Sequence, residues 1–97
     1  MPRATRPEWR PALAPRARLR VDRLTGRTML IYPERGLVLN DTAAAVVRLC
    51  DGTTTVSDIV ERLASEYQGP RADLAAEVEA LLWQLYDRNL LRGFGDG

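Results

Sequence analysis

The 97-residue sequence contains no histidine, no lysine and a single cysteine, Cys50. Without histidine, the chain lacks the usual general base near neutral pH and the commonest metal ligand. One cysteine forms neither an internal disulfide nor a zinc site, and it fits a reducing, cytoplasmic compartment. Glycine-rich phosphate loops are also missing. We therefore expect no catalytic residue, no metal site and no cofactor, and hence a protein that is not an enzyme.

Long apolar segments are absent as well. No run approaches the ~20 apolar residues that a membrane span requires. Arginines occur near the N-terminus, but no apolar stretch follows them, so the sequence does not predict a secretory signal. We expect no contact with a membrane.

The net charge is small, +1 at pH 7, but the charges are unevenly distributed. All fourteen cationic residues are arginines, against thirteen acids. Residues 1–35 carry nine arginines and three acids, a net charge of +6, whereas residues 36–97 carry a net charge of −5. A biased genome explains the missing lysine. Whether the basic half attracts an acidic partner stays open.

The first fifteen residues are broken up by proline. Proline blocks helix formation and pairing inside a sheet, so residues 1–15 are predicted to form a flexible arm. Trp9 and Leu13 are its only large apolar anchors. The four prolines are Pro2, Pro7, Pro11 and Pro15.

Three short strands are predicted to follow, over residues 16–22, 28–32 and 37–39. The first alternates arginines with apolar residues, and the second is apolar on both faces, as a central strand should be. Tight turns at Gly26 and over residues 33–36 connect the strands antiparallel, which leaves the first and third strands as edges. Such a small sheet needs a covering layer.

Three helices are predicted to supply that layer, over residues 42–50, 56–67 and 71–88. Asn40 or Asp41 caps the first helix, Thr55 caps the second, and Asn89 ends the third in a left-handed conformation. The fold class is therefore α+β, a winged-helix-like domain over residues 16–92 in which a three-stranded antiparallel sheet precedes three helices. Residues 93–97 are predicted to form a frayed tail.

Four ordered runs, at intact spacing, resemble one known family. They are LRVD at 19–22, LIYPER at 30–35, LNDTA at 39–43 and CDG at 50–52. The chain resembles the PqqD family, the peptide chaperones of pyrroloquinoline quinone (PQQ) biosynthesis, which belong to the RiPP recognition elements. The resemblance covers roughly residues 16–92.

The resemblance implies a function. Members of the family bind the ribosomal precursor peptide PqqA as an extra strand beside the third strand and against the third helix. They present it to PqqE, the radical S-adenosylmethionine (SAM) enzyme that holds the iron–sulfur chemistry. An apolar edge strand suits strand addition. The expected peptide-binding residues are Glu34, Arg35, Leu37, Val38, Leu39, Val78, Leu82 and Tyr86.

The third predicted helix departs from the family pattern. Leu81 stands where an aromatic residue is common, Asn89 where glycine is usual, and Trp83 where a polar residue is common. Trp83 shares a second, shallow apolar face with Ala76 and Ala80. This face is a docking surface, for PqqE, a second subunit or the peptide, or it is the place where the arm packs, with Trp9 on Trp83, or Trp83 simply lies on the surface.

Two other functions fit the sequence less well. A winged-helix DNA-binding protein would need a basic recognition helix, but the second and third predicted helices are mainly acidic, so we expect no nucleic acid partner. A structural adaptor without a peptide ligand fits the composition but not the open apolar edge. The exposed edge strand permits either a monomer or a homodimer.

Overall fold

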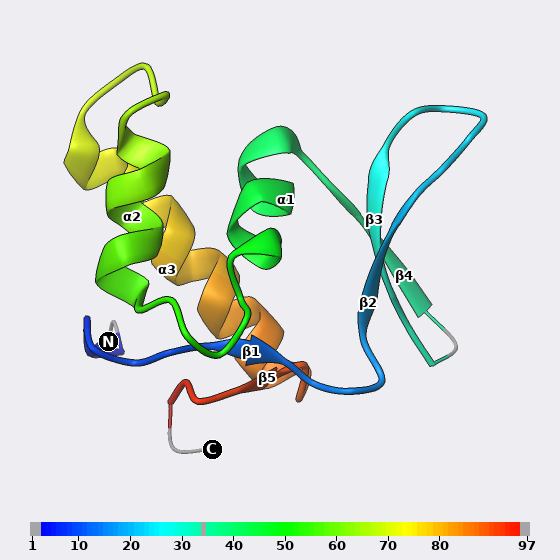
Figure 1. Ribbon diagram of the computed structural model, residues 1–97, viewed down its shortest axis with the longest axis horizontal. Helices are drawn as coiled ribbons and strands as arrows, with labels where there is room; N and C mark the ends of the chain where they lie inside the picture. The colour runs from blue at the N-terminus through cyan, green and yellow to red at the C-terminus, as the bar shows by residue number, and fades with distance from the viewer. Residues whose placement is uncertain (1–2, 34, 96–97) are drawn as a thin grey trace.

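The computed structural model describes residues 3–33 and 35–95 (Figure 1). Within these residues, four strands precede three helices, and a last short strand follows them. The elements are β1 (Ala12–Leu13), β2 (Arg18–Val21), β3 (Thr28–Tyr32), β4 (Arg35–Leu39), α1 (Asp41–Arg48), α2 (Val56–Ala64), α3 (Arg71–Asp87) and β5 (Leu91–Arg92). The predicted α+β class is confirmed.

The main sheet has the order β2-β3-β4 and is antiparallel throughout. Leu30 of β3 lies opposite Leu19 on one side and Leu37 on the other. Directly paired residues point to the same face, so these three leucines form the face that packs toward the helices. Leu30 is completely buried. As the sequence predicts, β3 is central and β4 is an edge.

Side chains cap two of the helices where the sequence predicts them. Asn40 Oδ1 accepts a hydrogen bond from the Ala43 amide at 2.7 Å, which fixes the start of α1. Thr55 Oγ1 accepts one from the Asp58 amide at 3.1 Å at the start of α2. Asn89 adopts a φ of 61° after α3. The helix predicted to reach residue 67 ends earlier, with Ser65 as its C-cap.

α3 supplies the centre of the core. Leu74, Val78, Leu82 and Leu85 follow one another at intervals of three or four residues, and all four are completely buried.

Among the described residues, no helix is long and apolar enough to cross a bilayer.

The N-terminal arm and the C-terminal tail, predicted to be flexible and frayed, pack against the domain in their described parts. β1 pairs antiparallel with β5, and the amide of Val56 donates to the carbonyl of Trp9 at 2.8 Å. Proline prevents helix formation, yet an extended chain still offers its carbonyls to neighbouring segments. Phe94, predicted to lie in a frayed tail, is completely buried, with its ring centre 4.9 Å from that of Trp9.

Replacing Trp9 with alanine should therefore destabilise the whole domain. The substitution removes the edge-to-face contacts with Phe94 and with Trp83, whose ring centre lies 6.0 Å away. Because Trp9 is partly rather than fully buried, we expect a loss of roughly 2–3 kcal/mol in the free energy of unfolding. Urea denaturation followed by circular dichroism measures it. The exposed neighbour Glu8→Ala is the control, and equal stability of both variants would show that the arm does not hold the fold.

Candidate functional site

The outer edge of β4 is open. β4 pairs with β3 along one side, and no described strand pairs with its other side. Val38 is 52% exposed, whereas Leu37 is partly buried and Leu39 is buried. An edge strand presents a row of backbone N–H and C=O groups to which another extended chain can bind.

A groove lies where β4 passes into α1, and α3 forms its far wall. It has a volume of about 210 Å³. Its lining residues are Asn40, Thr42, Ala43, Val46, Glu77, Ala80, Leu81 and Gln84. Glu77, Leu81 and Gln84 are spaced by four and three residues, so they form one stripe along α3. The groove thus combines a partly exposed apolar side chain, Leu81, with polar neighbours.

Charges of opposite sign lie near the two ends of β4. Arg88 follows α3 and donates from Nη1 to the Tyr32 hydroxyl at 2.9 Å, and Tyr32 pairs in register with Arg35. Two guanidinium groups therefore lie near the start of β4. Past its other end, Asp41 begins α1 and Glu77 lines the groove. An extended peptide along β4 would meet positive charge at one end and negative charge at the other.

The structure places the predicted peptide-binding residues in different environments. Arg35, Leu37, Val38 and Leu39 form β4 itself, and Glu34 lies outside the described residues.

The predicted residues of α3 do not line the groove. Val78 and Leu82 are completely buried, so their side chains support it only from behind. Tyr86 packs on Trp83 with ring centres 5.2 Å apart. The helical rotation of about 100° per residue instead turns Leu81 toward the groove. The spacing of Glu77, Leu81 and Gln84 was the sequence signal that this prediction missed.

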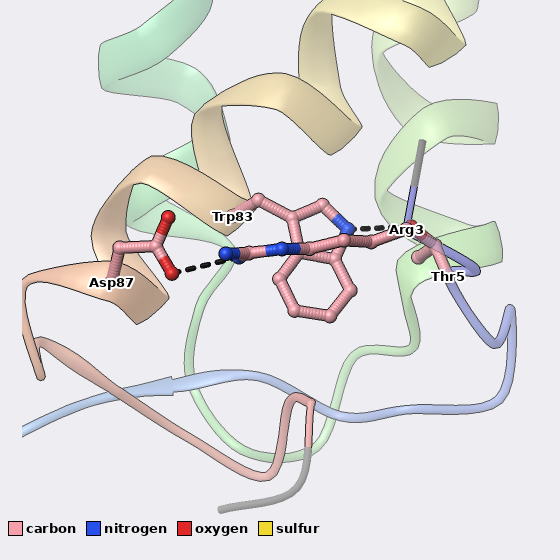
Figure 2. A network of polar contacts seen from close by, with 4 residues as sticks. All are labelled: Arg3, Thr5, Trp83 and Asp87. Carbon is pink, nitrogen blue, oxygen red and sulfur yellow. Dashed lines mark hydrogen bonds and ion pairs between the residues drawn. The ribbon is translucent and has the colours of Figure 1, made fainter. Parts of the chain in front are cut away.

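Trp83 is held by the N-terminal arm (Figure 2). Its Nε1 donates to Thr5 Oγ1 at 3.0 Å, and the guanidinium carbon of Arg3 lies 4.8 Å from the ring centre. Arg3 also forms a 2.7 Å ion pair with Asp87, one turn further along α3. The interpretation in which Trp83 packs against the arm, on Trp9, is confirmed.

A second hollow, of about 600 Å³, lies beside Trp83, with Ala76 and Ala80 in its wall. It adjoins the groove, because Ala80 and Gln84 line both. The larger volume of this hollow does not identify it as the functional site. No residue of an edge strand lines the hollow, and Arg3 reaches across it. A partner at the face of Trp83, Ala76 and Ala80 stays a prediction.

Two titratable groups just after α1, Cys50 and Asp51, have structural roles. Burial, and then the negative charge of Asp51, raise the pKa of the Cys50 thiol to about 12. Its Sγ donates to the Val46 carbonyl at 3.3 Å. The thiol therefore stays protonated at neutral pH and does not serve as a nucleophile.

Asp51 organises the turn between α1 and α2. Its Oδ1 accepts hydrogen bonds from the backbone amides of Thr53 and Thr54, both at 2.9 Å, and from the Thr53 hydroxyl. The Thr53 amide is the largest cause that lowers the pKa of this carboxyl to about 2. The ionised carboxylate thus stabilises the turn.

The family model described as Coenzyme PQQ synthesis protein D (PqqD) matches residues 27–91. A protein of Rhodopseudomonas palustris (strain BisB5) named PqqA binding protein is 40% identical over 82 residues, which cover 84% of this chain and 80% of the relative. One of Xanthomonas axonopodis pv. citri with the same name is 37% identical, over 86% of this chain and 90% of its own.

Two solved structures share the fold. The solution structure of the PqqD truncation of Methylobacterium extorquens PqqCD, described as a stand-alone RiPP recognition element, is 35% identical with a TM-score of 0.71, over 84% of this chain and 87% of its own. Lasso peptide synthetase B1, complexed with its leader peptide, is 25% identical with a TM-score of 0.72, over 86% of this chain and 98% of its own.

Replacing Asp51 with asparagine should reduce stability in a pH-dependent way. A carboxyl whose folded pKa is lowered stabilises the fold above its unfolded value of 3.8, and this contribution disappears as the pH falls through the folded value of about 2. We therefore expect the variant to be less stable than the parent at pH 7, with a gap that closes between pH 4 and 2. Urea denaturation across this range tests it. Glu66→Gln is the control, and a gap independent of pH would refute the role of the charge.

Proposed function

This chain belongs to the PqqD family, and on that premise we propose that it is a peptide chaperone. It binds the precursor peptide PqqA by strand addition on β4 and presents it to the radical SAM enzyme PqqE. The observation that carries the proposal is the edge of β4 with which no described strand pairs, next to the groove that Glu77, Leu81 and Gln84 of α3 line.

Backbone pairing along β4 supplies affinity that does not depend on the peptide sequence. Selectivity then requires side chains. Leu81 offers an apolar contact, and Arg35 and Glu77 offer charges of opposite sign toward the two ends. A matching peptide carries an apolar residue at the centre of the bound segment and an acidic residue toward Arg35.

The relatives support this function. The relatives from Rhodopseudomonas palustris and Xanthomonas axonopodis described above are both named PqqA binding protein, and each aligns with this chain over most of its length. Lasso peptide synthetase B1, whose fold matches over 86% of this chain, was solved with a leader peptide bound. A domain of this architecture therefore holds a leader peptide in at least one other protein.

The proposed role is not catalytic. The sequence has no histidine, and the protonated Cys50 thiol is buried. Chemistry on the peptide accordingly belongs to PqqE, and the chaperone works beside that enzyme in the cytoplasm. It is active as a monomer or a homodimer.

Calorimetric titration with synthetic PqqA, and with a scrambled peptide, tests the function. We expect saturable binding of one PqqA per domain and none of the scrambled peptide. Leu81→Asp should weaken PqqA binding about tenfold or more, because it places a charge against the apolar contact of the groove.

Leu24→Asp is the matched control. Leu24 is 95% exposed in the turn between β2 and β3, so its substitution should leave the affinity unchanged. Absence of PqqA binding to the parent protein would refute the proposed function. Equal weakening by both substitutions would exclude the groove as the binding site.

A further inference from the structure

The main sheet has a second face that the helices do not cover. Arg18 pairs with Ile31, Arg20 with Met29, and Met29 in turn with Val38. Paired residues share a face, so all five point away from the leucines that face α1. We call these five residues, together with Arg23 of the following turn, the outer sheet face. In Figure 1 all three helices lie to one side, and the loop between β2 and β3 projects beyond α1.

The outer sheet face has an apolar centre. Val38 on this face is 52% exposed, whereas the other exposed large hydrophobic side chains among the described residues lie elsewhere: Val21 pairs with Thr28 on the leucine face, and Leu24 lies in the turn after β2. Met29 and Ile31 also line a shallow hollow of about 240 Å³ with Arg20, Asp22 and Arg23. Contiguous apolar surface rimmed by polar groups marks a site of protein interaction.

The arginines of this face have no ion-pair partner among the described residues. The two ion pairs found there join Arg3 to Asp87 and Arg71 to Glu61. Arg18, Arg20 and Arg23 are all exposed. The neighbouring carboxylate of Asp22 accepts a hydrogen bond from the Leu24 amide at 3.0 Å, which shapes the turn and is the main cause that lowers the pKa of Asp22; the charge of Arg20 lowers this pKa further. This single carboxylate does not balance three arginines. An excess of positive charge therefore remains on the outer sheet face, and it attracts a surface of opposite sign.

The composition of the face favours a protein over a nucleic acid. Protein interfaces combine an apolar centre with a polar rim, and they are enriched in methionine and arginine. Met29, Ile31 and Val38 supply the centre, and the arginines supply the rim. Phosphate-backbone contacts need donors along the binding surface, and the aliphatic centre has none.

We propose that the outer sheet face docks an acidic surface of the peptide-modifying enzyme, and that the bound peptide completes this docking surface. The inference rests on the proposed function. A peptide strand added to β4 extends the sheet, so every second peptide side chain lies beside Val38 on the outer sheet face. The enzyme thus contacts the chaperone and its peptide together. It therefore binds the peptide-loaded chaperone more tightly than it binds the free chaperone or the free peptide.

Charge reversal of two rim arginines tests the proposal. The variant is Arg18→Glu with Arg20→Glu, and the matched control is Arg62→Glu with Arg92→Glu, two exposed arginines on α2 and β5. Affinities are measured first for PqqA alone and then for PqqE with the PqqA-loaded protein. We expect the rim variant to bind PqqA normally and to bind PqqE at least tenfold more weakly, with neither affinity changed in the control.

Circular dichroism confirms folding, and Arg18→Gln with Arg20→Gln provides a milder variant should the reversal unfold the sheet. Unchanged PqqE affinity in a folded rim variant would overturn the proposal. So would a shift of duplex DNA that the rim substitutions abolish while PqqE binding persists, since the face would then bind nucleic acid. Failure of the parent protein to bind PqqA, seen before PqqE is added, would instead refute the proposed function.

Discussion

The burial of one stripe of α3 fixes the arrangement of every other surface. Leu74, Val78, Leu82 and Leu85 are completely buried, and this sets the rotation of the helix about its own axis. The Leu81 side of α3 then faces the groove beside α1, and the Trp83 side faces the N-terminal arm. A substitution that polarises the stripe disturbs groove and arm together, because both depend on the same rotation.

Local sequence signals predicted most of the fold and less of the site. The bounds of β3, the caps at Asn40 and Thr55, and the left-handed Asn89 are determined by residues close in the sequence. The packing of Trp9 on Phe94 joins two ends of the chain and leaves no periodic pattern. The burial of Val78 and Leu82, which the sequence predicts to bind the peptide, could not be foreseen for a similar reason, since the boundary between a core stripe and a groove stripe depends on neighbouring elements.

The uneven charge of the sequence acquires a spatial meaning in the fold. The basic half forms β1, β2 and β3, and the arginines of β2 lie beside Met29 and Ile31, whereas the acidic half forms most of β4 and all three helices. The edge of β4 is the junction between them. Alternate side chains of a peptide strand bound there point to opposite faces of the sheet. One set contacts α3, and the other set extends the outer sheet face. The same strand therefore serves both recognition of the peptide and its presentation to the enzyme.

The central claim is that PqqA adds to the sheet along β4. Amide hydrogen exchange of the protein, measured with and without the peptide, tests this most directly, because a new strand protects the backbone that it pairs with. The account predicts slower exchange at outward amides within β4, with little change at β2, the opposite edge of the sheet. Protection confined to β2, or none in the sheet at saturating peptide, would contradict it.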